Sequence, residues 1–218
     1  NERYWEKKAR EKAAAEKERF TAMLKLEREL YAEGCELIAG VDEAGRGPLA
    51  GPLVIAAVIL PKDVFISGLN DSKQLSAKHR EALYDEIMEK AVATGIGMAS
   101  PARIDEINIL QATYEAMRQA IGQLSVEPEV LLNDAVTIPE VVIPQVPIIK
   151  GDAKSASIAA ASIVAKVTRD RMMKEYDIIY PGYDFAKNKG YGTKAHIEGI
   201  KKQGICDIHR RTFVKKYI

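Results

Sequence analysis

Residues 37–60 read LIAGVDEAGRGPLAGPLVIAAVIL, and this stretch determines the fold expected for the chain. Two apolar runs, 37–41 and 53–60, have the length and composition of buried strands. The loop between them is rich in turn-forming residues, namely Gly45, Gly47, Pro48 and Gly51. Because the connection is short, we expect the two strands to pair antiparallel.

Downstream of this hairpin, strands and helices alternate. Helices are predicted over about 76–93, 101–124, 157–176 and 194–203, and strands over 95–100, 129–134 and 144–149. Ser76 is the expected N-cap of the first of these helices. A hairpin followed by alternation predicts an α/β protein with a central mixed five-stranded sheet flanked by helices.

Residues 1–33 differ in composition from the rest of the chain. Lys, Arg, Glu and Ala dominate them and Gly and Pro are absent, which favours helix, and no secretory-signal pattern is present. Phe20, Leu24, Leu26 and Leu30 have helical spacing, so the later half of this helix has a face that can dock. We therefore divide the chain into a charged helical N-terminal extension, 1–33, and a domain, 34–218. The extension is either a solvated helix that packs at one end or a substrate-gripping or partner-binding segment.

Composition excludes several classes of protein. The 218 residues are 47% apolar and carry 32 Lys+Arg against 31 Asp+Glu, which is ordinary for a globular protein. No apolar run approaches the roughly 18 residues of a membrane helix. Two cysteines, Cys35 and Cys206, cannot form a disulfide framework or a four-cysteine zinc site, and predict a reduced, cytoplasmic setting. The net charge of +1 argues against a strongly basic nucleic-acid clamp, but the distribution of charge matters more than its sum.

Four acidic residues lie at the ends of predicted strands or in the turns beside them: Asp42, Glu43, Asp134 and Asp152. Neighbouring strand residues point to opposite faces, so Asp42 and Glu43 share a site only if the strand ends or bends there, which the following glycines permit. Carboxylates are the ligands that Mg²⁺ prefers, and paired metals serve phosphoryl transfer. The alternative is that these acids have ordinary turn or cap roles, such as Asp152 capping the helix after it.

Three loops carry side chains suited to nucleic acid. Gly45-Arg46-Gly47 offers close backbone approach and one guanidinium, and matches neither a Walker loop nor a dinucleotide motif. Asn70 and Lys73 lie in a polar loop in which Lys73 is available for phosphate. Tyr191, between two glycines, is able to stack on a base. Each loop also has a purely structural interpretation: a plain turn for the first two, and a tyrosine packed over its own loop for the third.

The C-terminal segment is basic. His209, Arg210 and Arg211, with Lys215 and Lys216, either line phosphates or form a solvated surface. The three histidines of the chain are scattered in sequence, which argues against a zinc site. Neither a Cys-His pair nor a Gly-x-Ser-x-Gly elbow indicates covalent catalysis.

Taken together, these segments resemble the bacterial ribonuclease HII family (type 2 ribonuclease H). The matching motifs follow the family's order over roughly residues 36–213: GVDEAGRGPLAGP at 40–52, NDSK at 70–73, DA at 134–135, KGD at 150–152, SIAAASIVAKVTRD at 157–170 and KGYGT at 189–193. The Gly-Arg-Gly tripeptide also favours ribonuclease HII over its sister HIII. The resemblance implies an RNase H-like fold with a C-terminal helical part, which makes 34–218 the catalytic domain.

The resemblance also implies an activity. It is hydrolysis of the phosphodiester 5′ of ribonucleotides in RNA-DNA hybrids, and of single ribonucleotides embedded in duplex DNA, leaving 3′-hydroxyl and 5′-phosphate ends. Two Mg²⁺ or Mn²⁺ ions are implied, held by Asp42, Glu43, Asp134 and Asp152. Substrate contacts are implied for Gly45, Arg46 and Gly47 at the ribose 2′-hydroxyl, for Tyr191 at the ribonucleotide-deoxyribonucleotide junction, and for Asn70 and Lys73 at phosphate. The implied enzyme is a cytoplasmic monomer.

One position departs from the family pattern. Asn133 stands where an apolar residue is usual, and on a central strand it needs a hydrogen-bond partner.

Two other functions stay open on the residues alone. One is an RNase H-fold enzyme of another kind, such as a resolvase or the other ribonuclease H class. The second is a nucleic-acid-binding module without catalysis, against which the four intact acids argue.

Overall fold

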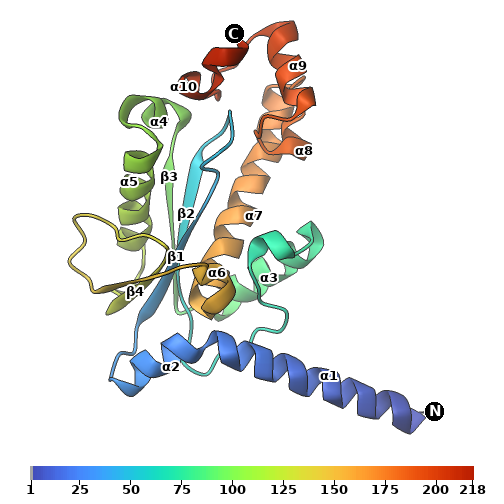
Figure 1. Cartoon of the computed structure of the whole chain (residues 1–218), viewed down its shortest axis with the longest axis vertical. Coiled ribbons are helices and arrows are strands. Elements are labelled where there is room, and N and C mark those ends of the chain that lie inside the picture. Colours follow the sequence, from blue (N-terminus) through green and yellow to red (C-terminus); the bar gives the residue numbers. More distant parts are fainter. Residues whose placement is uncertain (1) are drawn as a thin grey trace.

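A five-stranded sheet forms the centre of the molecule (Figure 1). The structure, a computed structural model, describes residues 2–218. The strands are β1 (Ile38–Ala44), β2 (Leu53–Ile59), β3 (Ala93–Ala99), β4 (Val130–Asp134) and β5 (Gln145–Ile148), in the order β3-β2-β1-β4-β5. β1, β2 and β3 pair antiparallel, whereas β4 and β5 continue parallel to β1. The predicted mixed sheet, including its opening hairpin, is confirmed.

Two helices cover the two faces of the sheet. α7 (Ala156–Ile179) crosses one face and α5 (Ile109–Gly122) the other (Figure 1). β2 is buried along its whole length because Ala56 and Val58 pack toward α7 while Ile55 and Ala57 pack toward α5. This explains why the sequence of β2 reads as an unbroken apolar run.

The sheet and α7 come into very close contact at Gly40 of β1. A Cβ atom built there would overlap the backbone of Ser157 at the start of α7. Only glycine fits this position, and the contact brings the N-terminus of α7 directly against the strand that carries Asp42.

The remaining helices include the predicted ones and three short helices that were not predicted. They are α1 (Glu2–Met23), α2 (Lys25–Ala32), α3 (Ala77–Lys90), α4 (Pro101–Ile107), α6 (Gly151–Lys154), α8 (Phe185–Asn188), α9 (Lys194–Gln203) and α10 (Arg211–Val214), with short 3₁₀ turns at Ser72–Gln74 and Lys215–Tyr217. Ser76 caps α3 as predicted, accepting from the His79 N–H. The single helix predicted over 101–124 is wrong. It is interrupted at Asn108, whose backbone is left-handed (φ 72°) and whose side chain caps α5.

The N-terminal extension consists of α1 and α2 and docks through its later half. The first half of α1 projects away from the sheet (Figure 1) and exposes Tyr4 and Trp5. Phe20 and Leu24 are buried in the cluster that includes the alanines of α7. Leu30 packs on a second cluster with residues of β1 and β4. The prediction that the later half of this segment docks is confirmed.

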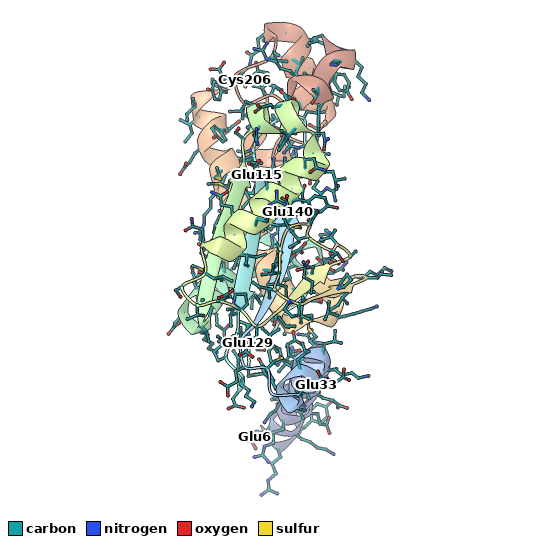
Figure 2. All side chains as sticks on the ribbon, turned by 90° about the vertical axis from the view of Figure 1, so that its left-hand side faces the viewer. Glu6, Glu33, Glu115, Glu129, Glu140 and Cys206 are labelled. Atoms are coloured by element: carbon teal, nitrogen blue, oxygen red, sulfur yellow. The ribbon has the colours of Figure 1, made fainter. Side chains whose placement is uncertain are left out.

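The C-terminal helices α8, α9 and α10 gather around the far end of α7. Figure 2 shows Cys206 of this region at one end of the elongated molecule and Glu6 of α1 at the other. Met173 of α7 packs there with Tyr183, Phe185 and Ile200. No helix within residues 2–218 has both the length and the apolar composition needed to span a bilayer.

Candidate active site

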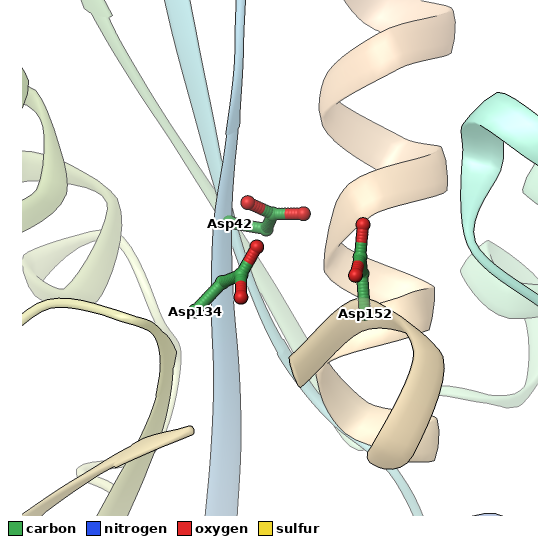
Figure 3. A group of neighbouring side chains, drawn as sticks. All are labelled: Asp42, Asp134 and Asp152. Atoms are coloured by element: carbon green, nitrogen blue, oxygen red, sulfur yellow. The ribbon is translucent and has the colours of Figure 1, made fainter. Parts of the chain in front are cut away.

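Three aspartates from distant parts of the chain meet beside β1, the central strand of the sheet (Figure 3). Asp42 lies near the end of β1 and Asp134 ends β4, and the parallel register of these two strands places the residues side by side. Asp152 comes from α6, on the other side of the group. One carboxylate oxygen from each aspartate lies within 4.8 Å of the other two.

The short helix α6 brings Asp152 to the group. Lys150, just before it, adopts a left-handed conformation (φ 55°), and the Gly151 N–H donates to Asp134 Oδ1 at 2.8 Å. The next helix, α7, is capped by Ser155, whose hydroxyl accepts from the Ile158 N–H at 3.2 Å. Asp152 is therefore not the cap of α7, and that interpretation is wrong.

Burial makes the charges of this group costly. Burial raises the pKa of Asp42 well above its usual range, and the nearby carboxylates add to the rise, although the Glu43 N–H donates to Asp42 Oδ1 at 2.8 Å and opposes it. Burial, followed by the neighbouring Asp71, raises the pKa of Asp152 to about 6. Lys73 Nζ lies 3.8 Å from Asp152 Oδ2, but its side chain is 77% exposed and offsets little of this charge. Clustered, buried oxygen donors of this kind suit hard divalent cations.

Removing one of these charges should stabilise the metal-free protein. The pKa of Asp152 is about 6 in the folded state against an ordinary 3.8, so its contribution to stability falls as the pH rises from about 4 to 6. Near pH 8, Asp152→Asn should therefore raise the free energy of unfolding by about 1–2 kcal/mol, which corresponds to a few degrees in Tm. Near pH 4 it should leave the free energy of unfolding unchanged. Melting curves with a chelator at both pH values measure this, with the exposed Asp63→Asn as control. A gain that is the same at both pH values would contradict it.

Glu43 follows Asp42 on β1 but lies apart from the three aspartates. Its Oε1 lies 3.4 Å from Arg46 Nη1, and this ion pair opposes the rise that burial causes in the pKa of Glu43. Both Asp42 and Glu43 nevertheless line the same cleft of about 230 Å³. β1 ends at Ala44, directly after these two residues. The end of the strand thus allows two adjacent residues to face one cavity, which is the condition for Asp42 and Glu43 to share a site.

The cleft brings three predicted loops together. Besides Asp42 and Glu43, it is lined by residues of these loops and of α7: Ala44, Gly45, Arg46, Gly47, Ser72, Lys73, Ser162, Lys166, Arg169 and Tyr191. The Tyr191 side chain is half-exposed and lies beside Gly47, where an added Cβ would be 3.5 Å from its ring carbon Cε1. Two segments 144 residues apart therefore form facing walls of one cavity.

Three predicted site residues do not line this cleft: Asp134 and Asp152, which adjoin it through Asp42, and Asn70, which lies apart. The Asn70 side-chain oxygen accepts from the Asp71 N–H at 2.8 Å, and Asp71 in turn accepts from the Lys73 N–H at 3.0 Å. These contacts are those of a plain turn. Asn70 lines a separate hollow with Arg19 and Lys154, next to α6.

Two buried arginines, neither of which is predicted from the sequence to have this role, hold the Gly-Arg-Gly loop in place. Arg169 of α7 donates to the carbonyls of Pro52 (2.8 Å), Ala50 (3.0 Å) and Lys189 (2.7 Å). It therefore ties the loop that begins at Gly45 to the segment that carries Tyr191. Burial lowers the pKa of Arg169 to about 10, so the guanidinium stays charged at neutral pH.

Arg210 makes a matching set of contacts from the C-terminal segment. It donates to the carbonyls of Gly45 (2.5 Å), Arg46 (2.9 Å) and Gly51 (3.0 Å), and its side chain is fully buried. His209 is buried as well, with its Nε2 2.9 Å from that of His196. The predictions that Arg210 and His209 either line phosphates or lie on a solvated surface are both wrong.

Asn133 finds the partner that its position on β4 requires. Its Nδ2 donates to Gln145 Oε1 on β5 at 2.8 Å, and the Gln145 side chain also bonds both backbone groups of Ile138. The Asn133 side-chain oxygen stays buried without a partner. The amide pairing holds β4 to β5 directly beside Asp134.

A mixed sheet flanked by helices, with aspartates meeting at the ends of parallel neighbours β1 and β4, defines the class of RNase H-like, metal-dependent nucleases. Residues 39–216 match the family model described as Ribonuclease HII. The chain belongs to the ribonuclease HII family, and the resemblance in its motifs is confirmed.

Individual relatives agree with this assignment. The chain is 72% identical over 178 residues to a ribonuclease HII of Lachnoclostridium phytofermentans, which covers 82% of this chain and 70% of that protein. It is 57% identical over 215 residues to a ribonuclease HII of Acetivibrio thermocellus, covering 98% and 84%. The crystal structure of ribonuclease H2 from Pyrococcus horikoshii OT3 matches with a TM-score of 0.67 at 30% identity, over 83% of this chain and 96% of that one. The chain is therefore an enzyme, a divalent-metal-dependent endoribonuclease of the ribonuclease H type.

Proposed function

We propose that this enzyme hydrolyses the phosphodiester on the 5′ side of ribonucleotides, in RNA-DNA hybrids and at single ribonucleotides within duplex DNA, leaving 3′-hydroxyl and 5′-phosphate ends. One observation carries the proposal. The three aspartates, within 4.8 Å of one another, adjoin a cleft walled by the Gly45–Gly47 loop and Tyr191. Catalytic groups and groups suited to recognise a ribose thus lie side by side.

The carboxylates would hold two divalent cations, Mg²⁺ or Mn²⁺. Asp42, Asp134 and Asp152 supply converging oxygens, and Glu43 would exchange its ion pair with Arg46 for a cation. Such ions, when bound, supply an activated water for attack on phosphorus and stabilise the leaving 3′ oxygen. Burial holds Asp42 and Asp152 in place, and the bond from the Gly151 N–H holds the half-buried Asp134, so little reorganisation is needed on binding.

The Gly45–Gly47 loop would recognise the ribose 2′-hydroxyl. Without side chains at Gly45 and Gly47 its backbone is open to close approach, and a 2′-hydroxyl both donates and accepts hydrogen bonds. The contacts that Arg169 and Arg210 make to backbone carbonyls of residues 45–52 keep the loop rigid, which is what discrimination of one hydroxyl requires. Tyr191 on the facing wall would stack on the sugar or base at the junction.

Lys73 and Asn70 would contact phosphate groups. Lys73 extends its exposed ammonium group toward Asp152 and so reaches the edge of the metal site. Asn70 borders the neighbouring hollow with Lys154, which suits a phosphate further along the strand. All these groups come from a single chain, so we propose that the enzyme acts as a monomer. Its two free thiols, Cys35 and Cys206, suit the reducing cytoplasm.

Substrate discrimination tests the proposal. A DNA duplex with one embedded ribonucleotide should be cut in the presence of Mg²⁺, and a matched all-DNA duplex should stay intact, because only the first presents a 2′-hydroxyl to the Gly45–Gly47 loop. Excess chelator should abolish the cut. Equal cutting of both duplexes would refute recognition of the 2′-hydroxyl, and a requirement for a run of ribonucleotides would favour the other ribonuclease H class.

A further inference from the structure

Glu27 of α2 is a fully buried carboxylate that lies outside the cleft described above. Its Oε1 accepts from the Ser155 hydroxyl at 2.6 Å and from the Ser157 N–H at 3.1 Å. Its Oε2 is buried without a hydrogen-bond partner. A buried carboxylate with one unused oxygen is costly, so the two contacts of Oε1 must outweigh that cost.

Both partners of Glu27 belong to the start of α7. Ser155 joins α6 to α7: its N–H donates to the Gly151 carbonyl at 2.8 Å and closes α6, while its hydroxyl accepts from the Ile158 N–H and caps α7. Glu27 adds a second acceptor at this helix N-terminus, where a negative charge is favourable. The capping of α7 is therefore shared between Ser155 and a residue of the N-terminal extension.

The same contacts hold α6, which carries Asp152. A helix of four residues has little stability of its own, so its orientation depends on what anchors its ends. At its N-terminal end, the Gly151 N–H donates to Asp134. At its C-terminal end, the Ser155 hydroxyl donates to Glu27. Figure 1 shows α6 next to the junction of α1 and α2. Glu27 lies in the first turn of α2.

We propose that Glu27 is a positioning residue for the metal site. Through Ser155 it fixes α6 and thereby holds the Asp152 carboxylate beside those of Asp42 and Asp134. This inference rests on the proposed function of the aspartates. It makes the N-terminal extension part of the scaffold of the active site, since α2 supplies an anchor that residues 34–218 do not replace.

Metal binding without substrate tests this role. Calorimetric titration with Mn²⁺ should show about tenfold weaker binding for Glu27→Ala than for the wild type, the size of effect typical of residues that orient metal ligands. Glu27→Gln should lose less, because its amide oxygen still accepts from Ser155 and Ser157. Glu33→Ala is the matched control: it removes an exposed carboxylate from the end of the same helix and should bind Mn²⁺ like the wild type.

Hydrogen exchange of the metal-free protein gives a second readout. The amides of residues 151–155 should exchange faster in Glu27→Ala and at the wild-type rate in Glu33→Ala. Mn²⁺ affinity within twofold of the wild type in folded Glu27→Ala would overturn the inference. If Glu27→Ala does not fold, Ser155→Ala is read by the same criterion, because it removes the hydroxyl that links Glu27 to α6. A wild type that binds no Mn²⁺ would instead refute the metal site itself, and this inference with it.

Discussion

Asp42→Asn is expected to lose cleavage activity on the order of 10³-fold while it still binds a ribonucleotide-containing duplex. One oxygen of Asp42 lies within 4.8 Å of an oxygen of Asp134 and of Asp152. A neutral amide lacks the negative charge with which this group would hold divalent cations. Duplex binding should persist or strengthen, because one buried negative charge that repels phosphate is gone.

Single-turnover cleavage and fluorescence anisotropy separate these two effects. The variant should fold normally, because the asparagine oxygen can still accept from the Glu43 N–H as Asp42 Oδ1 does. Asp63→Asn, a substitution of an exposed aspartate outside the site, should cleave like the wild type. Full activity of Asp42→Asn under Mg²⁺ would refute the assignment of the metal ligands.

Gly45→Ala should lower kcat/KM for the single-ribonucleotide duplex by about 10²-fold without weakening metal binding. Gly45 is left-handed (φ +94°), and an added Cβ would overlap the Arg169 side chain and lie 2.9 Å from the Pro52 carbonyl oxygen. Relief of the overlap requires the loop or Arg169 to move. Arg169 also holds Lys189 near Tyr191, so both walls of the cleft should shift while the aspartates stay in place.

Gly34→Ala is a closely matched control for this substitution. Gly34 has nearly the same positive φ (+97°), but no atom of the neighbouring structure lies within 4 Å of the Cβ that would be added. The two variants therefore share the cost of a left-handed alanine, about 1–2 kcal/mol, and differ in the clash. Gly34→Ala should be slightly less stable yet cleave normally. If Gly45→Ala also cleaves the duplex at the wild-type rate, the loop has no part in substrate recognition.

Much of the fold follows from local patterns in the sequence. The runs at 37–41 and 53–60 predict the hairpin because short apolar runs of β-forming residues, separated by a glycine-rich turn, are typical of paired strands. The acids of the site were found because they stand at strand ends, where parallel strands such as β1 and β4 bring side chains to one edge. The break at Asn108 was missed because apolar spacing continues across it, and one left-handed asparagine leaves no periodic signal.

The supports of the site could not be predicted in the same way. Arg169 and Arg210 bond to carbonyls of residues 45–52, which lie 117 to 165 positions away in the chain. Nothing in the local sequence distinguishes such a buried arginine from a solvated one. Glu27 is one of many glutamates in a charged helix, and its burial depends on how α2 docks. Such roles arise from tertiary contacts between segments whose local patterns are independent of one another.

The most direct test of the central claim is to identify the products of the duplex with one embedded ribonucleotide at nucleotide resolution. Mass spectrometry after incubation with Mg²⁺ should find a single cut 5′ of the ribonucleotide, with a 3′-hydroxyl on one fragment and a 5′-phosphate on the other. These ends are expected of water attacking phosphorus at the site formed by Asp42, Asp134 and Asp152. A cut on the 3′ side, or a 2′,3′-cyclic phosphate formed by attack of the ribose hydroxyl itself, would contradict the account.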